Sequence, residues 1–160
     1  MKAILSLAIA GLLAGACGTV SNGTPSRQDE VARKGATVMP FDLARTTHFF
    51  DDNATGGVQT VTANEKLDPV QVDLVRAHLA TEAEHFARGD FSDPARIHGN
   101  GMPGLQALAR GSARLRVTYR DIPGGASLAF SSDDPALVEA IHAWFAAQRS
   151  DHDAHAHHHG

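Results

Sequence analysis

Cysteine is almost absent from this 160-residue sequence, which contains only Cys17. A single cysteine excludes an intrachain disulfide, so the fold must be stabilised by packing. If this cysteine carries a lipid, any bound metal ion must be held without thiolate.

The sequence also lacks clustered basic residues and the common catalytic motifs. Fourteen Lys and Arg against 18 Asp and Glu give a net charge of −4, and nucleic-acid binding requires a clustered basic face. There is no G-x-S-x-G elbow, no P-loop and no H-E-x-x-H motif. We therefore expect no nucleic-acid partner and no nucleotide or flavin cofactor.

No hydrophobic run is long enough to span a bilayer. The apolar run of residues 3–13 follows Lys2 and leads through small residues to Cys17, which is the plan of a secretory signal peptide. Cys17 is then either the lipidated first residue of a lipoprotein or the free residue left after an A-x-A cleavage at residues 14–16. We favour lipidation, because a lone exported cysteine otherwise leaves an unpaired thiol in an oxidising compartment.

The predicted location is the cell envelope, with the lipid at Cys17 as membrane anchor. Gly18 is not the Asp that favours inner-membrane retention, so in a Gram-negative cell we expect the outer membrane, facing the periplasm. The predicted organisation is a signal peptide (1–16), a flexible tether (17–37), one α+β domain (38–150) and a His-rich disordered tail (151–160). Within the tether we expect a short helical turn at residues 28–34.

A pattern of two strands and a helix occurs twice. β-prone runs at 46–50 and 58–62 flank a loop of Asp, Asn and Gly, and runs at 115–120 and 126–130 flank Pro123, Gly124 and Gly125. A helix follows each pair and begins with an Asp-Pro sequence, at residues 68–69 and 134–135. We predict a duplicated ββα unit forming a four-stranded antiparallel sheet, with two main helices on one face of an α+β domain.

Histidine is abundant, with ten residues. Five of them lie in five separate segments, and closing the two units about a pseudo-twofold axis would bring several of these together as metal ligands. These candidates are His48, His78, His98, His142 and His152.

Two further groups of metal candidates are weaker. His78, Glu82 and His85 share one stripe of a predicted helix, where a solvated helix face is the alternative interpretation. The tail resembles short metal-sequestering tracts and is either native or a purification remnant. Its candidates are His155, His157, His158 and His159.

We expect a non-enzymatic, envelope-tethered protein that binds a transition metal through histidine, for metal tolerance or delivery. Zn(II), Cu(II) and Ni(II) suit imidazole ligands better than Cu(I) does. One alternative is a small periplasmic enzyme with His98 or His142 as general base, oriented by Asp121 or Asp93. Another is a non-catalytic interaction module, and the sequence leaves the oligomeric state open.

The segments "FARGDFSDPARIHGNGMPGL", "VTYRDIPGGA" and "LVEAIHAWFAAQRSDH" resemble a family of small exported bacterial proteins of unproven activity, some of which are named aspartate carbamoyltransferase. The resemblance covers nearly the whole mature domain. It includes the five separate histidines but neither His85 nor the terminal histidines. The name implies carbamoyl transfer, yet the Ser-Thr-Arg-Thr phosphate loop of those enzymes is absent here and the chain is about half their length. We therefore do not expect that activity.

Overall fold

The computed structural model describes residues 25–65 and 68–156 of the chain. In this part the elements follow in the order α1 (Arg27–Gly35), β1 (Thr46–Asn53), β2 (Gly56–Ala63), α2 (Pro69–Ala87), α3 (Ser92–His98), α4 (Leu105–Gly111), β3 (Arg116–Ile122), β4 (Gly125–Ser131) and α5 (Pro135–Ala156). Short 3-10 turns at Leu43–Arg45 and Ser112–Arg114 precede β1 and β3. The predicted hairpin and helix unit therefore occurs twice, as β1-β2-α2 and β3-β4-α5.

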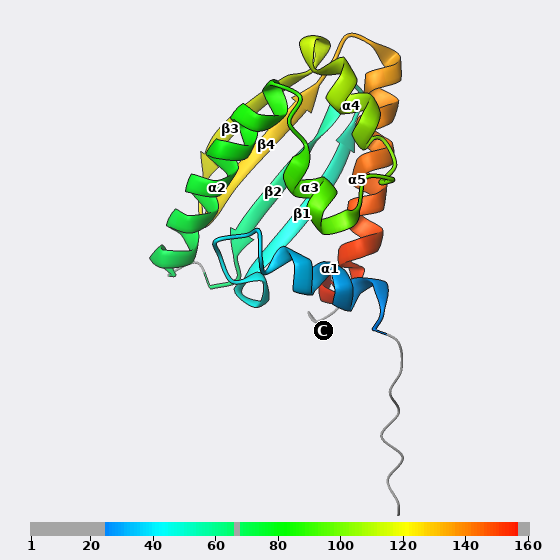
Figure 1. Ribbon diagram of the computed structural model, residues 1–160. Helices are drawn as coiled ribbons and strands as arrows, with labels where there is room; N and C mark the ends of the chain where they lie inside the picture. The colour runs from blue at the N-terminus through cyan, green and yellow to red at the C-terminus, as the bar shows by residue number, and fades with distance from the viewer. Residues whose placement is uncertain (1–24, 66–67, 157–160) are drawn as a thin grey trace, which may run out of the picture.

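The four strands form one antiparallel sheet in the order β1-β2-β4-β3 (Figure 1). The two hairpins meet along their second strands, where Thr60 of β2 lies opposite Ser127 of β4. β1 and β3 are consequently the edge strands. The predicted four-stranded antiparallel sheet is confirmed.

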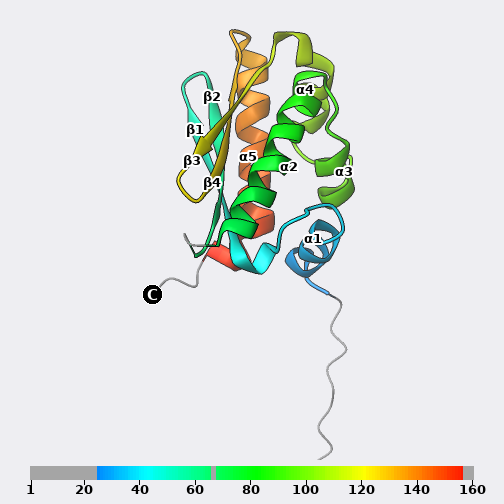
Figure 2. The same ribbon diagram turned by 90° about the vertical axis from the view of Figure 1, so that its left-hand side faces the viewer.

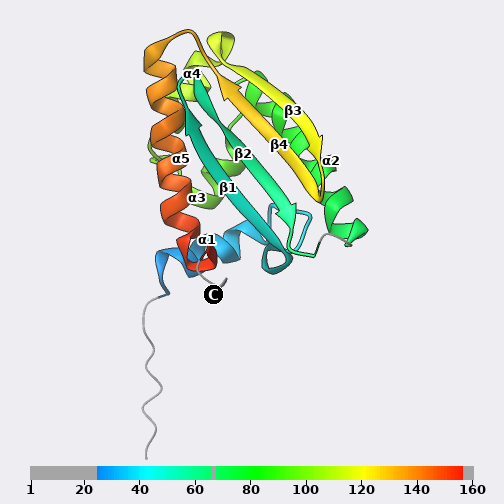
Figure 3. The same ribbon diagram turned by 180° about the vertical axis from the view of Figure 1, so that it is seen from behind.

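The helices cover one face of the sheet. Viewed along the edge of the sheet, the strands form one layer and the helices of the described chain form the other (Figure 2). Seen from behind, the strands lie in front of the helices (Figure 3). The predicted two-layer α+β architecture, with both main helices on the same face, is confirmed.

Each of the two main helices packs mainly on the hairpin of the other unit rather than on its own, and we call this arrangement an exchange of the helices. α2 lies mainly against β3 and β4, whereas α5 lies against β1 and β2 (Figure 1). Each helix therefore covers the hairpin of the other unit, and the two units bury their apolar faces only together.

An aromatic cluster fills the space between the layers. Trp144 packs edge-on against Phe86, Phe91 and Phe130, with ring centroids 5.3 to 5.8 Å apart. Gly104 lets the start of α4 approach α5 closely, because a Cβ at this position would lie 2.1 Å from the Ala140 carbonyl oxygen, and its φ is +77°. The core is continuous around the middle of α5.

The structure differs from the predicted tether at α1. Ser26 and Asp29 form a reciprocal capping box at the start of this helix, and Val31 is 1% exposed. The predicted turn at 28–34 is therefore a nine-residue helix that packs against α3 and α5. Burial of Val31 makes the helix part of the domain, so the flexible-tether prediction is wrong for this stretch.

The structure also differs from the predicted tail at its start. α5 continues through Ala156, and Asp151 and His152 are partly buried. The disordered-tail prediction is therefore wrong for residues 151–156, because Asp151 and His152 are packed against the domain. Residues 157–160 lie outside the described residues, as do the predicted signal peptide and Cys17.

None of the helices in the described ranges combines the length and the apolar character that crossing a bilayer requires.

Candidate metal centre

Four histidines from four different elements line one cavity of about 40 Å³ between the sheet and the helices. His48 comes from β1, His78 from α2, His98 from α3 and His152 from α5. A water molecule needs about 10 to 15 Å³ measured in this way, so the cavity has room for an ion and a few atoms of a small ligand. The predicted convergence of distant imidazoles thus occurs for four of the five candidates.

His152 lies between two other imidazoles. Its ring centroid is 5.5 Å from that of His48 and 5.3 Å from that of His98. Two imidazoles bound to one tetrahedral ion through bonds of about 2.0 to 2.1 Å have centroids about 5 Å apart. The two centroid distances at His152 are close to this spacing, but the ligand atoms of His48, His98 and His152 do not all lie within 4.8 Å of one another, so a shared ion requires the rings to reorient.

The local structure explains why two of these rings face inward. Along β1, alternate side chains point to opposite faces, so His48 and Phe50 lie on the helix-covered side. Along α5, Trp144, Gln148 and His152 are spaced by four residues and share one face of the helix. The buried aromatic face of α5 therefore extends into the cavity at its C-terminal end.

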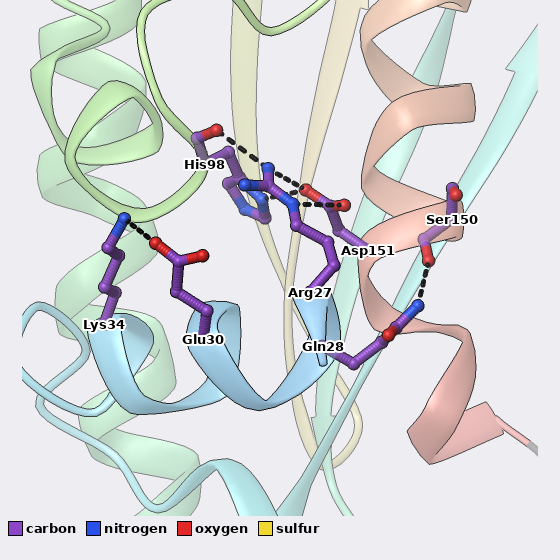
Figure 4. Close-up of polar contacts among 7 residues, drawn as sticks. All are labelled: Arg27, Gln28, Glu30, Lys34, His98, Ser150 and Asp151. Atoms are coloured by element: carbon purple, nitrogen blue, oxygen red, sulfur yellow. Dashed lines mark hydrogen bonds and ion pairs between the residues drawn. The ribbon is translucent and has the colours of Figure 1, made fainter. Parts of the chain in front are cut away.

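His98 is held by a carboxylate and a guanidinium (Figure 4). Gly99, with a φ of +92°, ends α3 directly after His98. The His98 Nδ1 atom lies 2.7 Å from an Asp151 carboxylate oxygen, and Arg27 donates to both Asp151 and the His98 carbonyl oxygen (Figure 4). A proton on Nδ1 shared with Asp151 leaves Nε2 as the ligand atom, which is the usual arrangement behind metal-bound histidines.

Burial favours the neutral form of two of the cavity imidazoles, His78 and His98. Desolvation lowers the pKa of His78, and it lowers the pKa of His98 although Asp151 acts in the opposite direction. Desolvation acts to raise the pKa of Asp151, but hydrogen bonds from Arg27 and His98 bring that pKa below its ordinary value. Since only the neutral ring binds a metal ion, these rings are prepared for coordination near pH 7.

Two buried polar atoms beside the histidines are unsatisfied. Among the described residues, Trp144 Nε1 and Gln148 Oε1 have no hydrogen-bond partner, and the two side chains are 1% and 5% exposed. Both residues line the cavity. A donor and an acceptor buried together indicate that the cavity receives a polar ligand able to satisfy both.

A second group of potential ligands combines Glu82, His85 and Asp93. Their ligand atoms all lie within 4.8 Å of one another. Glu82 is 5% exposed, and burial, together with the nearby Asp93 carboxylate, raises its pKa to about 7. Glu82 and Asp93 line the same cavity as His78, but His78 is not among the three residues whose ligand atoms come together, and the burial of Glu82 contradicts the alternative of a solvated helix face.

His142 lies apart from the cavity lining. Its Nε2 donates to the carbonyl oxygens of Asn53 and Gly56, at 3.0 and 2.8 Å. The ring thus stabilises the β1–β2 hairpin, and the prediction that it joins the other histidines is wrong. His155 lies in the last turn of α5 but its side chain is outside the described residues, as are His157, His158 and His159.

Asp121 and Asp93, the carboxylates predicted to orient a histidine base, hydrogen-bond or pair with other residues. Asp121 accepts a hydrogen bond from Tyr119, and Asp93 pairs with Arg96 at 3.1 Å. Asp151 is the carboxylate that contacts His98. The sequence offered little signal for Asp151, because it stands in a polar segment that is typical of a tail.

Comparison with protein-family models, curated proteins and solved structures found no match for this chain.

Proposed function

We propose that this protein is an envelope-tethered, histidine-based binder of a first-row transition metal ion, acting in metal tolerance or delivery. The ligands are His48, His98 and His152. The observation that carries the proposal is that the three rings line one cavity, with the His152 centroid 5.5 Å from that of His48 and 5.3 Å from that of His98. The envelope location rests on the N-terminal sequence and on lipidation of Cys17.

The surroundings of the rings support a specific ion site over a chance gathering. Protonated imidazoles that lie close together repel one another, whereas neutral imidazoles can bind a shared ion through their nitrogen lone pairs. A bound ion would therefore stabilise the close arrangement of the three rings. Asp151 supplies the carboxylate that orients His98, and Arg27 fixes that carboxylate. Partners of this kind raise the basicity of a histidine ligand and fix its tautomer.

The donor set favours Zn(II), Cu(II) or Ni(II). Imidazole suits these ions, and Met39 is the one thioether along the described cavity lining. Three nitrogen ligands leave a fourth position of a tetrahedral ion for water or another small ligand. Trp144 Nε1 and Gln148 Oε1 are available to hydrogen-bond such a ligand.

The proposal is tested with a chain whose tail histidines are replaced by alanine and which is purified without metal-affinity resin. Zinc titration by calorimetry should give one site per chain. H48A, H98A and H152A should each weaken it by at least tenfold, whereas H142A serves as the matched control and should leave it unchanged. Equal zinc affinity in H152A and in the parent chain would rule the site out.

A second candidate function is a small enzyme in which His98 acts as general base. The observation that favours it is the 2.7 Å contact between His98 Nδ1 and Asp151, which orients an imidazole beside a cavity. The corresponding test is hydrolysis of 4-nitrophenyl esters in the presence of a chelator. Activity that H98A abolishes and H142A retains supports the enzyme, and no activity above the buffer rate contradicts it.

A further inference from the structure

Glu82, His85 and Asp93 form a compact group of possible metal ligands where α2 ends and α3 begins. Their ligand atoms all lie within 4.8 Å of one another, and His85 Nδ1 is already 3.1 Å from a Glu82 carboxylate oxygen. In a tetrahedral site with bonds of about 2.0 to 2.2 Å, neighbouring ligand atoms are about 3.3 to 3.6 Å apart. A small rotation of the side chains would therefore place all three ligands around one ion.

The local fold brings Asp93 back to the last turns of α2. Glu82 and His85 are three residues apart and share one face of that helix. After the helix ends, Phe91 stacks on Phe86 with ring centroids 4.8 Å apart, which holds the start of α3 against the end of α2. The three ligands thus come from one short segment of the chain, unlike the histidines of the cavity.

The charges of this group favour a cation. Glu82 is 5% exposed, and its ion pair among the described residues is with His85, which is charged only when protonated. Asp93 pairs with the exposed Arg96 at 3.1 Å. With a neutral imidazole, two carboxylates and one guanidinium leave a negative charge uncompensated, and buried charges are normally paired or bound to a metal ion.

An unsatisfied acceptor in the same cavity also points to a hydrated cation. Glu82 and Asp93 line the cavity of about 40 Å³ together with Gln148. Gln148 is 5% exposed, and within the described chain its Oε1 has no hydrogen-bond partner. A carboxylate only accepts hydrogen bonds, whereas water bound to a metal ion donates them. An ion that keeps water ligands beside Glu82 and Asp93 would therefore supply the donor that Gln148 lacks.

We propose that Glu82, His85 and Asp93 bind a divalent metal ion of the Mn(II) type, at a site separate from the three histidines proposed above. Carboxylate and water ligands suit Mn(II), whereas a site made of imidazoles alone suits Zn(II), Cu(II) or Ni(II). Arg96 competes with the ion for Asp93, so zinc fills the histidine site first and reaches this one only at higher concentration. The inference does not rest on the histidine site.

The test titrates Mn(II) into the mature chain, residues 17–160 under the signal-peptide prediction, with Cys17 replaced by serine and the tail histidines by alanine. The paramagnetic resonance signal of free Mn(II) is lost on binding, and one ion per chain should bind. E82Q and H85A should each weaken binding by at least tenfold, the usual minimum for disturbing the surroundings of a metal ion. E84Q, at an exposed position of the same helix, is the matched control and should bind as the parent does.

H152A separates this site from the histidine site, because it removes a ligand of the latter and should leave Mn(II) binding unchanged. Circular dichroism checks that each variant is folded, and the half-buried position of His85 keeps the test open if E82Q is not. Mn(II) binding that H152A abolishes and H85A retains would overturn the inference. So would an equal loss in E84Q, or a parent chain that binds no Mn(II).

Discussion

Arg76 and His142 stand at equivalent positions of the two exchanged helices, seven residues after Pro69 and Pro135. Arg76 donates to the carbonyl oxygens of Ile122 and Gly125, the last residue of β3 and the first of β4. His142 donates to the carbonyl oxygens that close the β1–β2 hairpin in the same way. Each main helix therefore fixes the turn of the opposite hairpin through one cationic or imidazole side chain.

This equivalence predicts that arginine can replace His142. H142A should lower the free energy of unfolding by about 1 kcal/mol, because it removes the donor for two carbonyl oxygens. H142R should stay within about 0.5 kcal/mol of the wild type. Urea denaturation measures both, and an H142R protein no more stable than H142A would contradict the equivalence.

The metal site predicts different outcomes for two deletions at the C-terminus. Removing residues 153–160 keeps Asp151 and His152, so zinc should still raise the melting temperature. At a free zinc concentration of 100 times Kd, the expected stabilisation is about 2.7 kcal/mol. Removing residues 151–160 should abolish the increase, as thermal denaturation would show. An increase lost already in the shorter deletion would assign zinc binding to the tail.

The contact between His98 and Asp151 predicts that Asp151 is a positioning residue of the metal site. D151A should weaken zinc binding by about 10 to 100-fold, which is the usual effect of losing the carboxylate behind a histidine ligand. D133A is the matched control, because Asp133 pairs with Arg116 in an exposed ion pair. Competition with a zinc-binding dye measures both affinities. An equal loss of zinc affinity in D151A and D133A would mean that the effect comes from the change in net charge and not from the contact with His98.

Burial of Glu82 predicts a pH-dependent stability in the metal-free protein. The folded-state pKa is about 7 and the ordinary value is 4.5, so between these values the folded state holds a proton that the unfolded state has released. The contribution of Glu82 to stability is therefore complete below about pH 4.5 and is lost as the pH rises through 7.

E82Q keeps a neutral side chain at every pH and removes this dependence. Its stability relative to the wild type should increase by about 1 to 3 kcal/mol between pH 4.5 and 8. E84Q, at an exposed position of α2, should show no such change. Urea denaturation in a chelating buffer is the measurement, and parallel pH profiles for E82Q and the wild type would refute the buried ionisation.

The fold was predictable because each of its signals is local. Asp-Pro pairs begin α2 and α5, and glycines at positions 56 and 125 begin the second strand of each hairpin. α1 was predicted only as a helical turn, although Ser26 and Asp29 stand at capping-box spacing. Val31 and Gly35 are the buried residues of this helix, and one large apolar side chain in a polar segment gives no periodic signal.

The site was predictable in part, because imidazole is a common metal ligand and five of the histidines lie in separate segments of the sequence. Which rings meet depends on contacts between distant segments. Arg27 and Asp151 are 124 residues apart, and His98 and Asp151 are 53 apart. The same limit explains His142, whose spacing on α5 does not reveal that it faces a hairpin turn.

Because α2 and α5 each cover the hairpin of the other unit, the order in which the chain is synthesised limits when the two layers can pack. The β1–β2 hairpin is made early, but α5, the helix that covers it, follows every other described element along the chain. Until α5 is made, the apolar face of β1 lacks its main helical neighbour, and α2 has only part of the sheet to pack on. The two layers are therefore complete only after α5 has been synthesised, because its packing on β1 joins distant segments of the chain.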